Sequence, residues 1–193
     1  KVLPKLPESS LDKDSFLFIG TLYMQKGVYE LLDNYKKAYL VNSNILPLNI
    51  VGGGPEYKRI NDWIVQNSLS NKIFLHGPVF DLNEKATFFF RAYACISPIQ
   101  AGLSVLESLG YGVPFITMFD ALTGGERFNI KDGFNGVLLK KTEDLKNVLL
   151  DVCFNKEKYL TMGKNALEYY NNNRTPSHMT KGLIDAINFV SDK

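Results

Sequence analysis

The stretch from Ala94 to Met118 reads ACISPIQAGLSVLESLGYGVPFITM, and it decides the fold of the chain. Its first residues, 94–97, form an apolar run that is typical of a buried strand. A loop follows, and residues 104–109 then have the pattern of a helix. Two glycines and a proline end this helix and lead into a second apolar strand over residues 115–118. The stretch therefore predicts a strand–helix–strand unit.

Two residues of this unit indicate what it binds. Gly102 lies in the loop before the helix, where the missing Cβ lets backbone N–H groups approach a ligand, and the helix N-terminus behind it favours an anion. Glu107 stands one turn into the helix, where a carboxylate can accept hydrogen bonds from the neighbouring hydroxyls of a sugar. Phosphate and ribose together indicate a nucleotide, with a solvated helix carboxylate as the alternative interpretation of Glu107.

The rest of the chain repeats this alternation of strands and helices. Further apolar runs of strand length occupy residues 16–19, 48–51, 73–75 and 137–139. Segments with a helical period occupy residues 28–40, 55–64, 84–91, 143–153, 156–170 and 177–190, and the asparagine run 171–173 is predicted to be a loop. Such alternation predicts right-handed βαβ units, and so the fold class is α/β, a Rossmann-like three-layer domain with a parallel sheet covered on both faces.

The loops that follow the strands are expected to meet at one rim of this sheet. They span residues 20–27, 52–56, 76–81, 99–104 and 117–126. Ligands of open parallel sheets bind beyond the carboxyl ends of the strands. The topology alone therefore predicts a ligand crevice at this rim.

Composition excludes several classes of protein. A chain of 193 residues with a formal net charge of +2 suits one soluble domain and argues against nucleic-acid binding by bulk electrostatics. Cys95 and Cys153 lie in apolar runs and are interpreted as buried thiols in a reducing compartment. His76 and His178 have no partner at metal-ligand spacing, so we expect no metal site and no cofactor.

The segment 94–118 resembles the donor-binding signature of retaining GT-B glycosyltransferases, especially the family 4 (group 1) type. The matching residues are Ser97-Pro98, Gly102-Leu103, Glu107, Tyr111-Gly112-Val113-Pro114 and Phe115-Ile116-Thr117. The first glutamate of the family's Glu-x7-Glu block is absent, and its place is held by Ile99, or by Gln100 if the loop is one residue shorter. The resemblance covers roughly residues 16–170 and implies one half of a GT-B fold, the C-terminal donor-binding domain.

The resemblance also implies roles for individual residues of this segment. Gly102, Leu103 and Ser104 are expected to bind the donor diphosphate, and Glu107 the ribose. The donor-sugar loop is expected at residues Ile99, Gln100 and Ala101.

Two further segments resemble parts of the same signature. Lys26-Gly27 matches a family lysine that contacts the diphosphate, although Thr21 stands where the family has an arginine. A lysine is suited to this role as a compact point charge, and an ordinary surface lysine is the alternative.

Residues 73–79 resemble the strand whose exit holds the nucleobase through backbone groups. This assigns base binding to His76, Gly77, Pro78 and Val79. A general-base role for His76 is less favoured than a side chain that fills the strand end.

Three other features have structural interpretations that we prefer. Residues 51–56 are expected to form a tight turn beside the site, with Pro55 at the first helical position, and not a direct ligand contact. The triplet 88–90, three phenylalanines, is expected in the core and not as a base-stacking platform. Residues 123–126 resemble the family's Gly-Gly-x-x-Glu loop in compressed form, and Glu126 either faces the donor or is solvated.

The predicted protein is a glycosyltransferase that moves a sugar from a nucleotide-sugar to an acceptor hydroxyl, in polysaccharide or glycan biosynthesis. Residues 1–14 are interpreted as a linker or domain-connecting segment, and residues 15–193 as the nucleotide-sugar-binding domain. The acceptor site and most of the catalytic residues, which the sequence does not identify, are expected on an N-terminal domain of the same polypeptide, so that this chain is inactive alone. A cytoplasmic location is expected, with peripheral attachment to the inner face of the membrane through that other domain left open.

Two other classes stay open at this point. One is a GT-B-like nucleotide-sugar epimerase, which usually has additional carboxylates and a histidine in the cleft. The other is a non-catalytic nucleotide-binding module, such as a receiver-like domain, for which Asp120 lies near a strand end but lacks partner acids.

Overall fold

A single parallel sheet organises the molecule in the computed structural model, which describes residues 3–4 and 12–191. Its strand order is β3-β2-β1-β4-β5-β6, and every registered pair is parallel. The strands are β1 (Ser15–Ile19), β2 (Leu48–Val51), β3 (Ile73–Leu75), β4 (Ala92–Ile96), β5 (Phe115–Met118) and β6 (Gly136–Leu139). This confirms the predicted α/β, Rossmann-like sheet.

The two central strands, β1 and β4, are mainly apolar and therefore suited to the middle of the sheet. All five residues of β1 and all five of β4 are buried, because apolar side chains face helices on both sides of the sheet. The two strands lie side by side, with Phe16 in register with Ala94. The edge strand β3 has one exposed residue, Phe74, in a run of only three.

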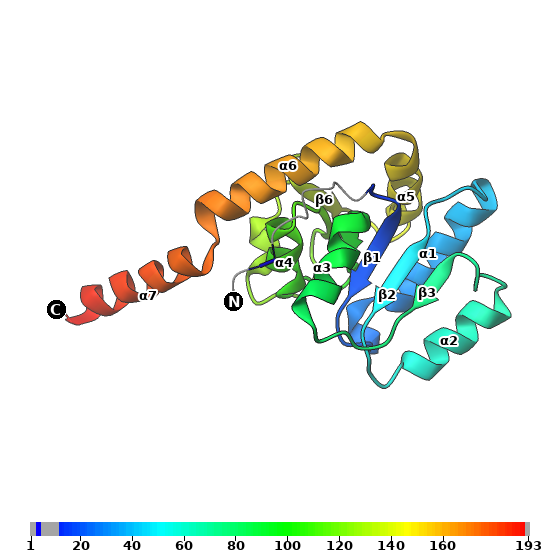
Figure 1. Ribbon diagram of the computed structural model, residues 1–193, viewed down its shortest axis with the longest axis horizontal. Coiled ribbons are helices and arrows are strands. Elements are labelled where there is room, and N and C mark those ends of the chain that lie inside the picture. The colour runs from blue at the N-terminus through cyan, green and yellow to red at the C-terminus, as the bar shows by residue number, and fades with distance from the viewer. Residues whose placement is uncertain (1–2, 5–11, 192–193) are drawn as a thin grey trace.

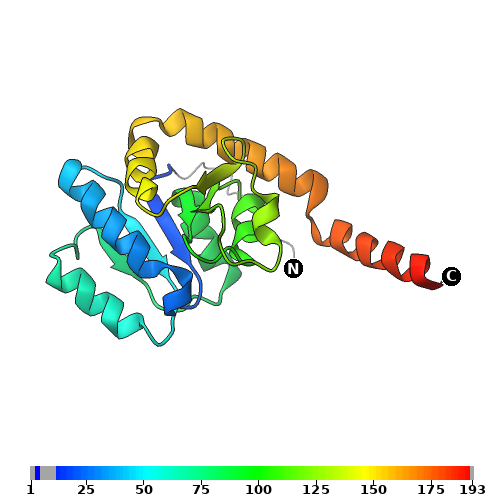
Figure 2. The same ribbon diagram turned by 180° about the vertical axis from the view of Figure 1, so that it is seen from behind.

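Helices cover both faces of the sheet (Figures 1 and 2). Helices α1 (Val28–Val41) and α2 (Tyr57–Gln66) lie on one face, and α3 (Leu82–Arg91) and α4 (Ser104–Gly110) on the other. Helix α5 (Asp144–Phe154) packs on α1, and α6 (Lys156–Asn173) contacts both α4 and α5. The change of face occurs where the chain returns from β3 to β4, so the loops after β1 and β4 diverge and leave a crevice between them.

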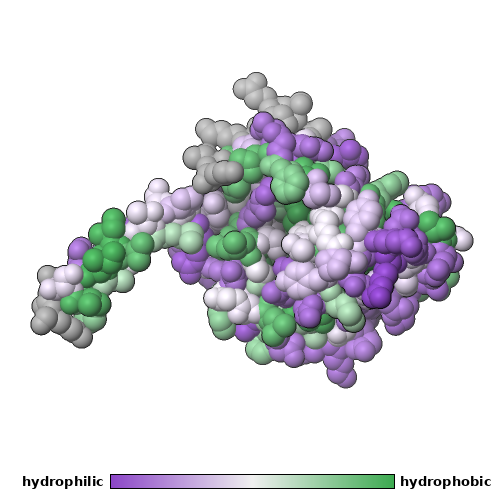
Figure 3. All heavy atoms as spheres, turned by 90° about the horizontal axis from the view of Figure 1, so that it is seen from below, coloured by the Kyte–Doolittle hydropathy of each residue, from purple (hydrophilic) through white to green (hydrophobic). Residues whose placement is uncertain are grey.

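The last helix, α7 (Pro176–Ser191), extends away from the body of the domain (Figure 1). All of its residues are exposed. Apolar side chains gather along it (Figure 3), and the large ones are Met179, Leu183, Ile184, Ile187, Phe189 and Val190. Among the helices that the structure describes, none is long and apolar enough to cross a membrane.

The structure corrects two local predictions. Asn171–Asn173 were expected in a loop, but they form the last turn of α6, where the Asn173 amide donates to the Tyr169 carbonyl. Pro55 was expected at the first helical position, but α2 begins at Tyr57. The reason is that the Glu56 N–H bonds to the Leu22 carbonyl in the first loop, so the intervening residues form a turn.

Other expectations about packing hold. Phe89 and Phe90 are buried in the core, as predicted, and Phe88 packs against it. Both cysteines are free thiols, Cys95 buried and Cys153 partly buried. Most of the predicted linker, residues 1–14, lies outside the described residues.

Candidate functional site

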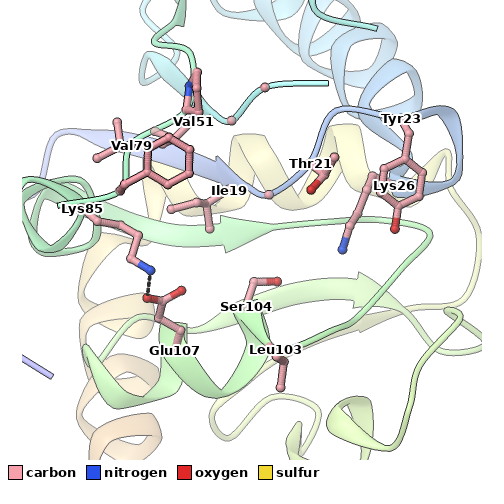
Figure 4. A pocket seen from close by; sticks show the side chains of 15 residues that line it. Ile19, Thr21, Tyr23, Lys26, Val51, Val79, Lys85, Leu103, Ser104 and Glu107 are labelled. Carbon is pink, nitrogen blue, oxygen red and sulfur yellow. Dashed lines mark ion pairs between the residues drawn. The ribbon is translucent and has the colours of Figure 1, made fainter. Parts of the chain in front are cut away.

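A cavity of about 650 Å³ opens at the carboxyl ends of the strands, where the crevice was predicted. Side chains that follow β1, β2, β3 and β4 line it, and Figure 4 shows most of them. The lining residues are Ile19, Gly20, Thr21, Tyr23, Lys26, Val51, Gly52, Gly53, Pro78, Val79, Phe80, Lys85, Leu103, Ser104 and Glu107. We call this cavity the cleft.

The first two loops interlock to form one wall of the cleft. Gly52 has a φ of +153°, and a Cβ there would come within 3.0 Å of the Gly20 carbonyl. The Leu22 N–H donates to the Gly53 carbonyl, which ties the loops together. Only glycine permits so close an approach at position 52. Because Gly52 and Gly53 line the cleft, the turn that was expected beside the site is part of its wall.

Lys26 projects its ammonium group across the cleft from this wall. It ends a 3-10 turn, η1 (Met24–Lys26), that stops at Gly27 in the left-handed region, with φ +74°. Its Nζ lies 3.7 Å from where a Cβ on Gly102 would sit. Burial lowers the pKa of Lys26 below its ordinary value, and the Glu126 carboxylate opposes this shift. The cleft therefore holds a partly desolvated cation against a glycine of the facing loop.

The facing loop leads into α4 and presents unpartnered polar groups. The Ser104 hydroxyl oxygen is shielded from solvent and has no hydrogen-bond partner among the described residues. Leu103 beside it is largely exposed. A hydroxyl buried without a partner is costly unless a ligand or water meets it. The arrangement of Lys26, Gly102 and Ser104 thus suits an anion.

Glu107 lies at the other end of the cleft and forms an ion pair with Lys85 of α3 (Figure 4). The two side chains are 22% and 20% exposed, respectively. The apolar side chains of Ile19 and Val79 lie near this end (Figure 4). The cleft therefore has a cationic end at Lys26 and an end at Glu107 where a carboxylate meets apolar walls.

The predicted donor-sugar loop does not line the cleft. Gln100 accepts a hydrogen bond from the Tyr23 hydroxyl, which closes the loop over residues 99–101. Ala101 is fully buried, and Ile99 packs against Gly27 so closely that any Cβ at that glycine would collide with it. In the described structure these residues support the loop before Gly102.

Of the four predicted base-binding residues, two line the cleft and two do not. Pro78 and Val79 line the cleft. The Gly77 carbonyl accepts from the Gly52 N–H and so braces the wall. His76, however, does not line the cleft, since its ring meets Phe88 at 4.7 Å and its Nε2 lies 2.7 Å from the Asn49 side-chain oxygen. Its side chain fills the strand end, which was the preferred alternative to a general base.

The structure adds residues that the sequence did not single out. Lys85, Tyr23 and Phe80 line the cleft, but Lys85 stands in an ordinary amphipathic helix and no local pattern marks it. Glu126 does not line the cleft, because its carboxylate accepts hydrogen bonds from Thr123 and the Gly124 N–H. Within the described part of the chain, no group of three or more His, Cys, Asp or Glu side chains is placed to hold a metal ion.

Comparison with known proteins identifies relatives across most of the chain. Residues 4–169 match the family described as glycosyl transferases, group 1. The uncharacterized glycosyltransferase MJ1178 of Methanocaldococcus jannaschii is 31% identical over 158 residues, which are 79% of this chain and 42% of the relative. The O-antigen chain mannosyltransferase C of Escherichia coli is 25% identical over 177 residues, 88% of this chain and 45% of the relative. The chain thus spans less than half the length of these relatives.

Solved structures of similar fold are more distant in sequence. TarM of S. aureus, a crystal structure in complex with UDP, superimposes with a TM-score of 0.81 at 18% identity, over 96% of this chain and 37% of TarM. The C-terminal domain of a group 1 glycosyl transferase, LpcC, from Francisella tularensis gives a TM-score of 0.73 at 16% identity and covers 86% of this chain and 88% of that domain. These matches show a common fold.

Proposed function

This chain belongs to the glycosyl transferases group 1 family, and we propose on that basis that its cleft binds the nucleotide part of a nucleotide-sugar donor. The bound donor would give its sugar to an acceptor hydroxyl. A relative that is a UDP-N-acetylglucosamine–peptide N-acetylglucosaminyltransferase subunit, and solved structures of similar fold in complex with UDP, support this proposal.

One observation carries the proposal: Lys26 and the unpartnered Ser104 hydroxyl line one cleft at the strand carboxyl ends, and the Lys26 ammonium lies against Gly102, beside that cleft. A diphosphate would satisfy all three, since its oxygens accept from an ammonium, a hydroxyl and backbone N–H groups. Toward the other end, the free oxygen of Glu107 would accept from the ribose, and Val79 and Ile19 would contact the base. The lining side chains contribute two cations and one carboxylate, a balance that favours an anionic ligand.

The leaving diphosphate would be stabilised electrostatically by Lys26 and backbone N–H groups, in the role that a metal ion plays in other transferases. We also propose that this chain is the C-terminal half of a two-domain enzyme, and that the acceptor binds to the other half. Its correspondence in size to the solved C-terminal domain of LpcC supports this reading.

Calorimetry with UDP, GDP and ADP, each with and without EDTA, tests the proposal. We expect one of them to bind with an affinity that EDTA does not change. Replacing Lys26 by Met should weaken that binding by about 1–3 kcal/mol, the scale of a lost charge-assisted hydrogen bond.

The matched control is Lys58→Met, which removes a lysine from the exposed side of α2, away from the cleft. This variant should bind like the unmodified chain. Binding that strictly requires Mg²⁺ or Mn²⁺, or that Lys26→Met leaves unchanged, would contradict the proposed site.

A further inference from the structure

Lys85 is a second cation in the cleft, and the proposed contacts with the diphosphate do not involve it. It lies at the end opposite Lys26 (Figure 4), and its ammonium group pairs with Glu107. The pair bridges α3 and α4 across the cleft, with about four fifths of each side chain shielded from solvent. A largely shielded pair of this kind has a fixed geometry more readily than an exposed one, because water competes less for both partners.

The packing of α3 determines where Lys85 points. The Asp81 carboxylate caps the helix by accepting from the N–H groups of Asn83 and Glu84, each at 2.9 Å. One turn beyond Lys85, the buried ring of Phe89 stacks on Tyr111 at the end of α4, with 4.7 Å between the ring centroids. Cap and stacking contact together hold α3 against α4, so that Lys85 faces Glu107 before any ligand arrives.

The pair leaves part of the carboxylate available. Lys85 contacts Oε1 of Glu107, and no described residue donates to Oε2. A carboxylate offers about four acceptor positions, and so an oxygen engaged by one ammonium group does not exhaust it. Glu107 can therefore accept a ligand hydroxyl while it stays paired.

We infer that Lys85 is a positioning residue that holds Glu107 in the orientation in which its free oxygen accepts a ribose hydroxyl. This inference rests on the proposed function, because it takes the ligand to be a nucleoside diphosphate. Lys85 acts through Glu107 and not on the phosphates, which lie at the Lys26 end of the cleft. Its loss should consequently reduce the discrimination between ribose and deoxyribose, and not affinity in general.

The test measures four proteins against matched nucleotides. The proteins are the unmodified chain, Lys85→Met, Glu107→Gln and the double variant, and methionine is chosen because it has a similar length without the charge. The nucleotides are whichever of UDP, GDP and ADP binds best, and its 2′-deoxy and 3′-deoxy analogues. We expect the unmodified chain to prefer the ribonucleotide to at least one analogue by about tenfold or more.

Lys85→Met should weaken ribonucleotide binding by about five- to tenfold and leave binding of that analogue within about twofold. The double variant should bind the ribonucleotide no more weakly than Glu107→Gln alone, since a residue that acts only through Glu107 has nothing left to contribute. Three results would each overturn this inference and leave the proposed function intact. They are equal losses of affinity for the ribose and deoxyribose forms, additive losses of affinity in the double variant, and no effect of Lys85→Met. If the unmodified chain binds none of the three nucleotides, the proposed function falls and this inference with it.

Arg91→Met is the matched control, because it removes a cation and an ion pair, with Asp14, from the same helix but outside the cleft. It should leave the ribose preference unchanged. Circular dichroism confirms that each variant is folded, and Lys85→Gln, which keeps an N–H donor but no charge, replaces Lys85→Met if that variant does not fold. The ribose preference of Lys85→Gln should lie between that of the unmodified chain and that of Lys85→Met.

Discussion

Burial and ligand binding place opposite demands on the ammonium group of Lys26. Burial disfavours its charged form and lowers its pKa from the ordinary 10.5, while Glu126 favours the charge. A bound diphosphate would favour the charge further. Lys26 is therefore easier to deprotonate than a surface lysine.

This difference predicts a pH dependence of nucleotide affinity. Lys26 is charged below its lowered pKa and loses its proton as the pH rises through that pKa. We expect the affinity for the nucleoside diphosphate to fall on the alkaline side, beginning at a lower pH than the ordinary 10.5 would give. Calorimetry across a pH series measures this fall.

Lys26→Arg provides the control, because a guanidinium group stays charged throughout the accessible range. The nucleotide affinity of Lys26→Arg should stay constant over the pH range in which the affinity of the unmodified chain falls. An identical alkaline loss in both proteins would assign the titration to the nucleotide base or to another residue.

The sequence could predict some site residues and not others, for reasons visible at single positions. Lys26, Ser104 and Glu107 stand in loops or helix starts that directly follow strands, and parallel topology brings such positions together. His76 also follows a strand, but its ring packs on Phe88 and its Nε2 meets Asn49, so that its side chain does not line the cleft. Lys85 was not predicted because only the tertiary contact between α3 and α4 brings it to the cleft.

At the scale of elements, one close backbone contact fixes α6 on the domain. Gly163 of α6 lies so near Gly112 that a Cβ at position 163 would come within 3.0 Å of the Gly112 carbonyl oxygen. Gly112 itself has a φ of +67°, which favours glycine, and ends the turn after α4. Two glycines therefore let a helix approach the loop before β5 at backbone distance.

We expect Gly163→Ala to lower the free energy of unfolding by about 1–3 kcal/mol, even though alanine is the better helix former by about 1 kcal/mol. The neighbouring atom is backbone and cannot move as a side chain would. Urea unfolding followed by circular dichroism measures the change.

The comparison is Gly182→Ala in α7, where a Cβ would meet nothing within 4 Å. This variant should not lower the free energy of unfolding. If both alanine variants behave alike, the close contact at Gly163 does not limit stability.

The sequence predicted each strand and α-helix by type, but it did not predict the 3-10 turn η1 or some of the helix boundaries. Asparagine has low helix propensity, so residues 171–173 were expected in a loop. In the structure α6 continues through them, because Tyr169 and Tyr170 just before them pack against the core and the Asn173 amide bonds to the Tyr169 carbonyl. At Pro55 the determining interaction was the Glu56 N–H bonding to Leu22, a contact between loops that lie far apart in sequence.

At the scale of the whole molecule, the cleft is open on one side and α7 is exposed along its full length. The chain spans less than half the length of MJ1178 and of the E. coli mannosyltransferase. The proposed second domain would close over the cleft, exclude water and position the acceptor.

This predicts that the 193-residue chain binds nucleotide but does not sustain sugar transfer. Without a facing domain, the anomeric carbon of a bound donor would be exposed to solvent. Donor consumption with a panel of acceptors, compared with buffer alone, measures this. Continued transfer to an acceptor by this chain alone would place the catalytic residues within it and contradict the two-domain proposal.

The adjacency of β1 and β4 also dictates when the cleft comes into existence. During synthesis, Lys26 leaves the ribosome long before Ser104 and Glu107, because two strands and three helices are translated between β1 and β4. Closing so long a loop costs chain entropy before the parallel pair forms, and such non-local pairing is slow. A nascent polypeptide therefore has no binding site until α4 has emerged. Binding of the proposed ligand therefore cannot guide the first steps of assembly, and β5, β6, α5 and α6 still follow α4 along the chain.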